Sequence, residues 1–282
     1  MHRPIRAAGL AAVAVTALLS SAAVAQPAEA RDDDGWRDTL TIGVGAAIAP
    51  SYDGSDNYVI IPSGVVRGQV SGFNFFARGP QIFVDVIRDK GDVDIELGPV
   101  AGLRLDRTNR IRDDRVRALG EIDTAVELGG FAGLGKTGVF TSDFDSISVR
   151  VAYVRDVADA HDSYVISPAI EYVTPLSKTL LVGASVSADI VGDGYASTYF
   201  DIDPAGSAAS GLAPFDADGG LRAVSFGLLG GVSLSGDLRR GWSLFGIGVY
   251  SRLQGDFARS PIVSEAGSAD QVFGGLGLAY TF

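Results

Sequence analysis

Gly274-Gly275-Leu276-Gly277-Leu278-Ala279-Tyr280-Thr281-Phe282 is the stretch of sequence that decides the fold. Successive side chains of a β-strand point to opposite faces, so Leu276, Leu278, Tyr280 and Phe282 share one face and small residues occupy the other. An apolar face rimmed by aromatic residues is typical of a lipid-facing strand in an outer-membrane β-barrel. For nine residues alone, an ordinary hydrophobic edge strand remains the alternative.

The same stretch carries a second indication. A terminal Phe282, with Tyr280 and Leu278 before it on one face, resembles the signal that the barrel-assembly machinery reads on its substrates. We therefore expect this machinery to be a partner, and we expect the protein to lie in the outer membrane of a Gram-negative cell.

Period-2 alternation recurs through the chain, which predicts further strands. In 93–104, for example, Val93, Ile95 and Leu97 oppose Asp94 and Glu96. The alternating segments are about 9–12 residues long, which is what a tilted strand needs to cross a membrane. They are 40–48, 93–104, 146–156, 164–172, 180–190, 224–234, 245–253 and 274–282. We predict an all-β fold, an antiparallel transmembrane barrel.

The connection lengths predict the strand number. Outer-membrane barrels have short periplasmic turns and longer outer loops. Counted back from a periplasmic Phe282, the connections largely alternate, from a long 256–270 to a short 88–91. The count reaches the N-terminus correctly if 72–88 is two strands that turn near Gly79-Pro80. This gives about twelve strands, and ten is the alternative because 72–78 is short.

The N-terminus has the layout of a secretory signal peptide. Arg3 and Arg6 precede an apolar run from Ala7 to Leu19, and Ala23-Val24-Ala25 offers a small-x-small cleavage site. A membrane-spanning helix needs about 20 apolar residues, more than this run contains. We expect 1–25 to be the signal peptide, 26–38 a periplasmic leader and 39–282 the barrel.

Composition excludes several function classes. The chain has no cysteine, which excludes disulfides and Cys-ligated metal sites. Removing Arg3 and Arg6 from the 23 basic residues leaves 21 against 34 acidic ones, a formal charge of −13. Because nucleic-acid binding depends on basic side chains that neutralise phosphates, we expect no nucleic-acid partner. We also expect no cofactor.

Several short motifs, taken in order, resemble the MipA/OmpV family of outer-membrane proteins. Pro50 to Ser55 is similar to a Pro-x-Tyr-x-Gly-Ser element, and Arg110 to Asp123 to a loop-and-strand segment. The most specific block is Tyr195-Ala196-Ser197-Thr198-Tyr199-Phe200, with Ser210-Gly211 after it; Ser260-Pro261-Ile262-Val263 and Tyr280-Thr281-Phe282 follow. Asp201-Ile202-Asp203 departs from the family, which more often has Gly-Val there.

The resemblance implies an outer-membrane barrel and suggests a task. Some members of this family are assigned a non-enzymatic role, a scaffold between a murein lytic transglycosylase and a peptidoglycan synthase. Other members are linked to adhesion, osmotic response or antibiotic passage. The resemblance thus implies the fold more firmly than the partners.

The inner face of the predicted barrel is acidic, which supports a different function. With the apolar faces outward, seven acids point inward: Asp94, Glu96, Asp123, Glu127, Asp156, Glu171 and Asp189. In these strands they are opposed only by Arg104, Arg150 and Arg252. Unpaired acids in a dry lumen are costly, so water should enter. This predicts a small cation-tolerant channel as the alternative, with a plugged, hydrated barrel equally open.

An arginine cluster lies in the long connection 105–119. It comprises Arg107, Arg110, Arg112, Arg115 and Arg117, interleaved with Asp106, Asp113 and Asp114. The connection should face outward, where arginine can grip the phosphates of lipopolysaccharide. We expect either this contact, through Arg110, Arg112, Arg115 and Arg117, or a loop whose charges pair with one another.

Catalysis has little support in the sequence. The mature chain has one histidine, His161, in the turn His161-Asp162-Ser163. Three adjacent residues cannot form a Ser-His-acid triad, which needs convergent geometry. Asp216-Ala217-Asp218-Gly219 lacks the later ligands of a calcium loop. We expect a non-enzyme, although distant partners for His161 would permit an outer-membrane hydrolase.

Overall fold

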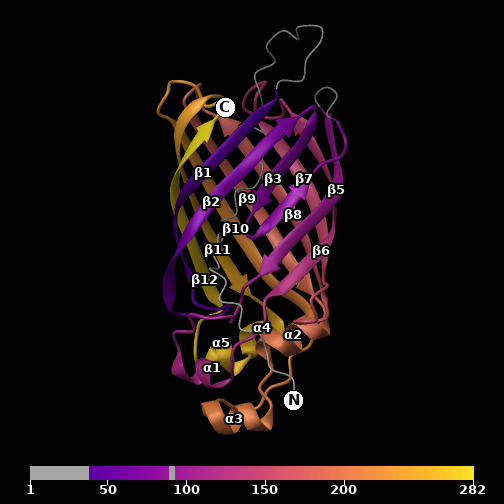
Figure 1. The fold of residues 1–282 in the computed structure, drawn as a ribbon, viewed down its shortest axis with the longest axis vertical. Helices are drawn as coiled ribbons and strands as arrows, with labels where there is room; N and C mark the ends of the chain where they lie inside the picture. Colours follow the sequence, from indigo (N-terminus) through magenta and orange to yellow (C-terminus); the bar gives the residue numbers. More distant parts are fainter. Residues whose placement is uncertain (1–37, 89–92) are drawn as a thin grey trace, which may run out of the picture.

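In the computed structural model, residues 38–88 and 93–282 form a closed antiparallel barrel of twelve strands (Figure 1). The predicted signal peptide and nearly all of the leader lie outside the described residues. The strands are β1 (Thr39–Pro50), β2 (Tyr58–Val70), β3 (Phe73–Arg78), β4 (Gln81–Val84), β5 (Val93–Arg104), β6 (Ala125–Thr137), β7 (Ser146–Asp156), β8 (Tyr164–Pro175), β9 (Leu180–Val191), β10 (Gly220–Ser233), β11 (Gly241–Leu253) and β12 (Asp270–Thr281).

The barrel closes between its first and last strands. β12 pairs with β1, with Tyr280 opposite Ile42 and Gly274 opposite Ile48. Small residues make this seam tight, because a Cβ on Gly45 would lie 2.2 Å from the carbonyl oxygen of Leu276. The twelve-strand prediction is confirmed, and the alternative of ten strands is wrong.

The uncertain segment 72–88 forms a short hairpin. β3 and β4 turn at Gly79-Pro80, and the backbone N–H of Leu103 donates to the carbonyl of Pro80 at 3.1 Å. β3 pairs with β2 only from Arg67 to Val70. Among the described residues, β2 therefore pairs with β3 only near the C-terminal end of β2.

The outer face of the wall is an apolar belt. Alternate residues of the strands are exposed, including Val44, Ile60, Leu134, Leu228 and Leu276, and the residues between them face inward. Trp242, Tyr280 and Phe282 stack edge to face at one rim. Apolar outside and polar inside, with aromatic residues at a rim, is the pattern of a transmembrane barrel.

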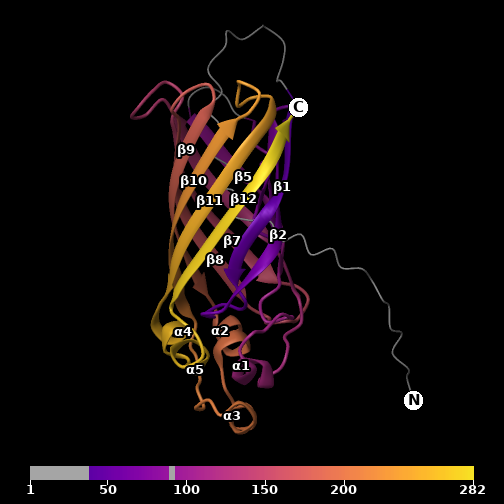
Figure 2. The ribbon, with the colours of Figure 1, turned by 90° about the vertical axis from the view of Figure 1, so that its left-hand side faces the viewer.

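The two ends of the barrel differ. The end that carries the C-terminus has the turns 71–72, 138–145, 176–179 and 234–240. The opposite end has the long connections 105–124, 192–219 and 254–269, which hold all the described helices (Figure 2). Because short turns face the periplasm, the helical end is the outer one.

The helices are short and lie together beyond the strands. They are α1 (Asp114–Ala118), α2 (Asp193–Phe200), α3 (Pro204–Ser210), α4 (Gly255–Arg259) and α5 (Pro261–Ser264). Within 38–88 and 93–282, no helix has the length and apolar character needed to cross a bilayer.

Candidate functional site: the lid and the charges beneath it

The connections 51–57, 105–124, 192–219 and 254–269 pack into one folded unit over the outer mouth, here called the lid (Figures 1 and 2). Local sequence explains its helices. Asp113 caps α1 by accepting from the N–H groups of Arg115 and Val116, and Asp203 caps α3 by accepting from Gly206. Pro204 and Pro261 open their helices, where a missing N–H costs nothing.

The lid has a hydrophobic core of its own. Tyr195 and Phe200 of α2 are fully buried, and Phe200 packs edge to face on Phe257 of α4, with ring centroids 5.1 Å apart. Ile262 and Val263 of α5 are also fully buried. A buried aromatic cluster of this kind is a packed interior, so the lid is a folded cap rather than a set of loose loops.

Hydrogen bonds and close backbone contacts tie the lid segments together. The Tyr52 hydroxyl donates to the carbonyl of Ala266 at 2.6 Å, and the Ser260 hydroxyl donates to that of Phe200 at 2.7 Å. Gly54 has φ 95°, and a Cβ there would lie 2.4 Å from Val263. Only glycine fits this contact.

Most of the motifs that resemble the MipA/OmpV family therefore meet in one place, whereas Tyr280-Thr281-Phe282 lies at the opposite end of the barrel. Tyr52 and Gly54, the Tyr195 to Phe200 block, and Ser260 to Val263 are far apart in the sequence but adjacent in the lid. Their shared structural task is to close the outer mouth.

A first layer of charges lies directly under the lid. Arg104 of β5 binds Glu127 of β6, with Nε 2.7 Å from Oε1, and its guanidinium lies 4.9 Å from the centre of the Tyr195 ring. The same oxygen of Glu127 also faces His161, whose Nε2 is 3.4 Å from Oε1. This layer joins the wall to α2, because Arg104 also donates to the Tyr195 hydroxyl at 3.3 Å.

A β-bulge supplies a second basic residue to this layer. The register of β9 and β10 shifts between Leu221 and Ala223, and Arg222 is the extra residue. Bulges re-aim side chains, and Arg222 binds both Asp189 of β9 and Asp53 of the lid.

Asp106 completes the junction between lid and wall. Its carboxylate accepts from the backbone N–H of Asp53 at 2.8 Å. Burial and the nearby charge of Asp53 raise the pKa of Asp106 to about 6. The protonation of this group should therefore change near neutral pH.

A second layer of ion pairs crosses the lumen below the first. Arg150 of β7 binds Glu96 of β5 at 2.6 Å and lies over the ring of Phe76. Arg78, at the tip of the β3–β4 hairpin, binds Glu171 of β8 at 3.1 Å. Because β3 and β8 are on opposite sides of the strand order, this pair spans the interior.

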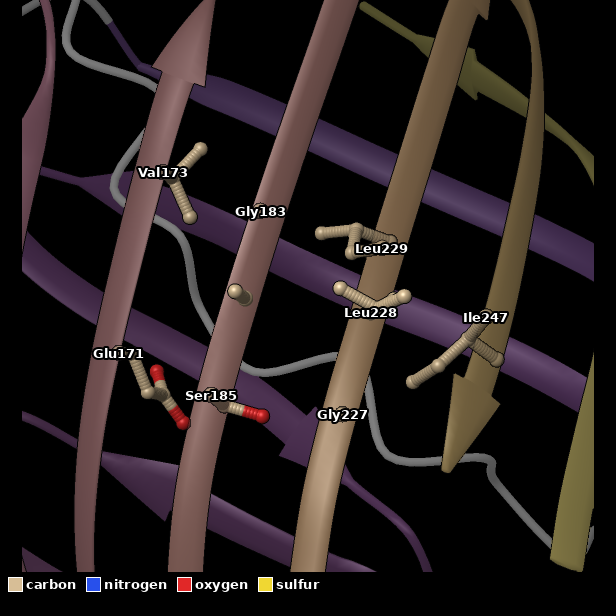
Figure 3. Close-up of a pocket in the computed structure, with 9 residues that line it drawn as sticks. Glu171, Val173, Gly183, Ser185, Gly227, Leu228, Leu229 and Ile247 are labelled. Atoms are coloured by element: carbon tan, nitrogen blue, oxygen red, sulfur yellow. The ribbon is translucent and has the colours of Figure 1, made fainter. Parts of the chain in front are cut away.

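A small hollow lies beside the Arg78–Glu171 pair. A hollow bounded by Glu171, Ser185 and Leu229 has a volume of about 20 Å³, room for about one water. Figure 3 shows Glu171 and Ser185 side by side on neighbouring strands of its wall.

The predicted acidic lumen needs correction. Asp94, Glu96, Glu127, Glu171 and Asp189 are on the inward face of their strands. Asp156 is buried and accepts from the N–H of His161 at 2.7 Å, which shapes the β7–β8 connection. Asp123 precedes β6 and is exposed, so its placement in the lumen is wrong.

The bases were also misassigned. Arg252 faces outward and pairs with Asp270 at 2.8 Å. Arg78 and Arg222 face inward, which the sequence analysis did not predict. Arg78 lies at a hairpin tip and Arg222 in a bulge, and at both places the alternation of residues no longer indicates which way a side chain points. With these two bases the inner acids are largely paired, which removes the basis for a strong cation preference.

The predicted arginine cluster divides into two groups. Arg107 is buried and donates to the carbonyl of Tyr199 at 3.2 Å. Arg117 pairs with Asp114, and Arg115 donates to the carbonyl of Glu265. Arg110 and Arg112 are exposed at the helical end. The contact with lipopolysaccharide stays a prediction, and these two residues are the best placed to make it.

The predicted assembly signal lies on the outside of the barrel. Leu278 and Phe282 are exposed, and Tyr280 lies between Trp242 and Phe282 at the periplasmic rim. This accords with a signal read from the lipid side, which stays a prediction.

The arrangement offers little to catalysis. The His161 side chain is fully buried and its ring nitrogen faces Glu127, so a substrate cannot reach it in this state. Among residues 38–88 and 93–282, no group of His, Asp and Glu side chains is placed to hold a metal ion. The lid covers the outer mouth, and the ion pairs lie in the lumen beneath it.

Comparison with known proteins gives a family match. Residues 42–282 match the family described as MltA-interacting protein MipA. No curated protein sequence matches significantly. Two similar solved structures are an outer-membrane channel of Pseudomonas putida F1 (12% identity, 90% of this chain and 99% of that one, TM-score 0.45) and OmpT of Vibrio cholerae (7%, 88% and 99%, 0.34). At these scores the likenesses say nothing about the activity of this chain.

Proposed function

Since the chain belongs to the MipA family, we propose that it is a non-enzymatic outer-membrane scaffold that holds a murein lytic transglycosylase at its periplasmic end. The family description names an interaction with such an enzyme, MltA. The observation that supports the proposal is a lid packed over the outer mouth and an ion pair, Arg78–Glu171, that crosses the interior below it. A barrel obstructed in this way is better suited to anchoring than to conduction.

The β6–β7 turn, 138–145, offers a surface for this partner. Asp145 is fully buried and accepts from the N–H groups of Val139, Phe140 and Thr141 at 2.6, 2.8 and 2.6 Å. These bonds hold Phe140 at the tip with 71% of its surface exposed. A rigid turn with an exposed aromatic residue is a typical anchor for a protein partner.

A binding assay with purified components tests the proposal. The protein in detergent micelles is immobilised, and the affinity of a purified murein lytic transglycosylase is measured with and without a peptidoglycan synthase. We expect saturable binding that Phe140→Ser weakens about tenfold or more, because an aromatic anchor contributes at least 1.4 kcal/mol. Arg112→Ser, at the outer end, is the matched control and should leave binding unchanged.

Two outcomes of this assay contradict the scaffold. One is no binding by folded wild-type protein. The other is equal loss from Arg112→Ser and Phe140→Ser, which would place the partner away from the periplasmic turns.

The second candidate, a small cation-tolerant channel, is favoured by one observation. The inner face carries three glutamates, Glu96, Glu127 and Glu171. Each pairs with an arginine, so we expect at most a weak cation preference. Cation-selective current through folded wild-type protein in a planar bilayer would favour this function over a sealed scaffold.

A further inference from the structure

The inner face of the wall differs between the two sides of the barrel. On β5 to β7, large side chains at mid-strand are buried in the lumen, as Val100, Phe131 and Arg150 illustrate. On β9 and β10, serines take the inward positions, and Ser185 and Ser225 are only half-buried although they line the lumen. The interior is therefore packed on one side, and on the other it leaves room that water can enter.

Two hollows lie on this more open side. The first is the hollow beside Glu171, and the second, also of about 20 Å³, is bounded by Arg78, Ser187 and Ser225. Ser185 lines both hollows, so the two are neighbours. Each has room for about one water.

Glu171 indicates what fills the first hollow. Its carboxylate is buried, with Arg78 and Arg150 at 3.1 and 3.9 Å from its two oxygens. Neither oxygen accepts a hydrogen bond from the described residues, whereas buried polar atoms normally have such a partner. The Ser185 hydroxyl lies beside Glu171 on the neighbouring strand (Figure 3). A water between these two groups satisfies both, so the hollow is polar enough to be wet.

The periplasmic boundary of the first hollow is apolar. Val173 and Leu229 line the hollow, and they form a small cluster with Leu181 near the periplasmic ends of their strands. Leu238, from the β10–β11 turn, packs on this cluster. Its backbone N–H donates to the carbonyl of Lys178 at 3.0 Å, which ties its turn to the β8–β9 turn. Hydrophobic constrictions of this kind exclude water and thereby gate pores.

We propose that β9 to β11 line a water-filled route for small monovalent ions, and that Leu238 is the hydrophobic gate at its periplasmic end. Arg78 and Glu171 place one charge of each sign beside the route. The lid covers the outer end, so the route is a closed compartment while the lid and Leu238 stay in place. This inference rests on the second candidate function, the channel, and it leaves the scaffold function unchanged.

Cysteine labelling tests the route in the full-length chain, which has no cysteine of its own. Ser225→Cys places a thiol of similar size in the second hollow. Protein in lipid nanodiscs is treated with 2-aminoethyl methanethiosulfonate, a small monovalent cation, and labelling is followed by mass spectrometry. We expect slow labelling that Leu238→Ser accelerates about tenfold, because the closed gate loses the burial of a leucine side chain.

Two controls separate gating from a general loosening of the barrel. Leu234→Ser makes the same substitution at an exposed position four residues away and should leave the labelling rate unchanged. Ala152→Cys places a thiol in the packed side of the interior and should stay unlabelled with and without Leu238→Ser. Heat-modifiable migration checks that each variant has a folded barrel.

Three results overturn the proposal. The first is labelling of Ser225→Cys that Leu238→Ser does not accelerate. The second is equal acceleration by Leu234→Ser, and the third is labelling of Ala152→Cys as fast as that of Ser225→Cys. Failure of the channel is a separate result, because labelling measures entry of the cation and a planar bilayer measures its passage across the membrane.

Discussion

The two ends of this barrel differ in the length and packing of their connections. At the outer end, long connections fold into a lid with its own aromatic core, centred on Tyr195 and Phe200. At the periplasmic end, short turns are held by single polar residues, such as Asp145, and leave apolar tips such as Phe140 exposed. The outer end is covered by a packed unit, and the periplasmic end exposes an apolar side chain. The proposed closure and the proposed partner binding should therefore be separable by mutation.

The largest expected effect comes from the centre of the lid. Tyr195→Ala removes a fully buried ring and should destabilise the lid by about 3–5 kcal/mol. Phe140→Ala, the same kind of truncation at the other end, should cost about 0.5 kcal/mol or less because its ring is exposed. Limited proteolysis of folded protein compares them. Equal protease sensitivity of the two variants would remove the contrast between the ends.

The next effect concerns the periplasmic turn. Asp145→Ala removes the acceptor of three backbone N–H groups and should destabilise the turn by about 1–3 kcal/mol. Hydrogen exchange in 138–145 should rise while exchange in the lid does not change. Binding of the transglycosylase should weaken as in Phe140→Ser. A turn that stays protected would show that Asp145 does not order it.

The two ends should respond oppositely to acid. Asp106 has a raised pKa, about 6, so its ionisation destabilises the folded lid. This destabilisation is absent below the pKa of the unfolded state, about 4, grows as the pH rises to 6 and is fully present above it. Burial opposes ionisation of Asp145, but hydrogen bonds from Thr141, Tyr172 and Val139 hold its pKa below the usual range. The stabilisation of the turn by ionised Asp145 is fully present above the pKa of the unfolded state, about 4. It is lost only as the pH falls below that value.

Hydrogen exchange, corrected for its intrinsic pH dependence, measures this difference. Lid protection should be higher at pH 5 than at pH 7.5, and Asp106→Asn should flatten the profile while still accepting from Asp53. The 138–145 turn should not change over the same range. A lid that loosens at pH 5 would contradict the assignment of Asp106.

The smallest effect is expected on the exposed face of the lid. Arg110→Ser with Arg112→Ser should change lid stability by about 0.5 kcal/mol or less. If these residues grip lipopolysaccharide, its retention during purification should fall, whereas Arg117→Ser, which breaks the pair with Asp114, should not lower it further. Unchanged retention of lipopolysaccharide by the double variant would contradict the proposed contact.

Alternation and connection length predict most of the wall from the sequence. Side chains alternate strictly between the two faces of a strand. The sequence therefore predicts that Leu276 and Leu278 point outward and that Glu96 and Arg150 point inward. The same counting finds the short hairpin at Gly79-Pro80, because the parity of the barrel requires it. The seam between β1 and β12 follows because a membrane barrel cannot leave an edge open.

The lid and its charges are harder to predict, for a physical reason. Beyond the strands the chain has no fixed period, so nothing local shows that Tyr52 meets Ala266 or that Ser260 meets Phe200. Alternation does not predict the inward direction of Arg222 because a bulge reverses it. It does not predict the exposed position of Asp123 because β6 begins after this residue. The family resemblance pointed to the right segments, but only their packing shows that they form one lid.

Single-channel recording tests the closed barrel most directly. Wild-type protein is compared in planar bilayers with a variant in which residues 193–218 are replaced by a short Gly-Ser turn, and both are checked for a folded barrel by heat-modifiable migration. We predict no current steps from the wild type and small steps from the variant, since removal of α2 and α3 opens the outer mouth. Wild-type steps as large as those of the variant would contradict the account.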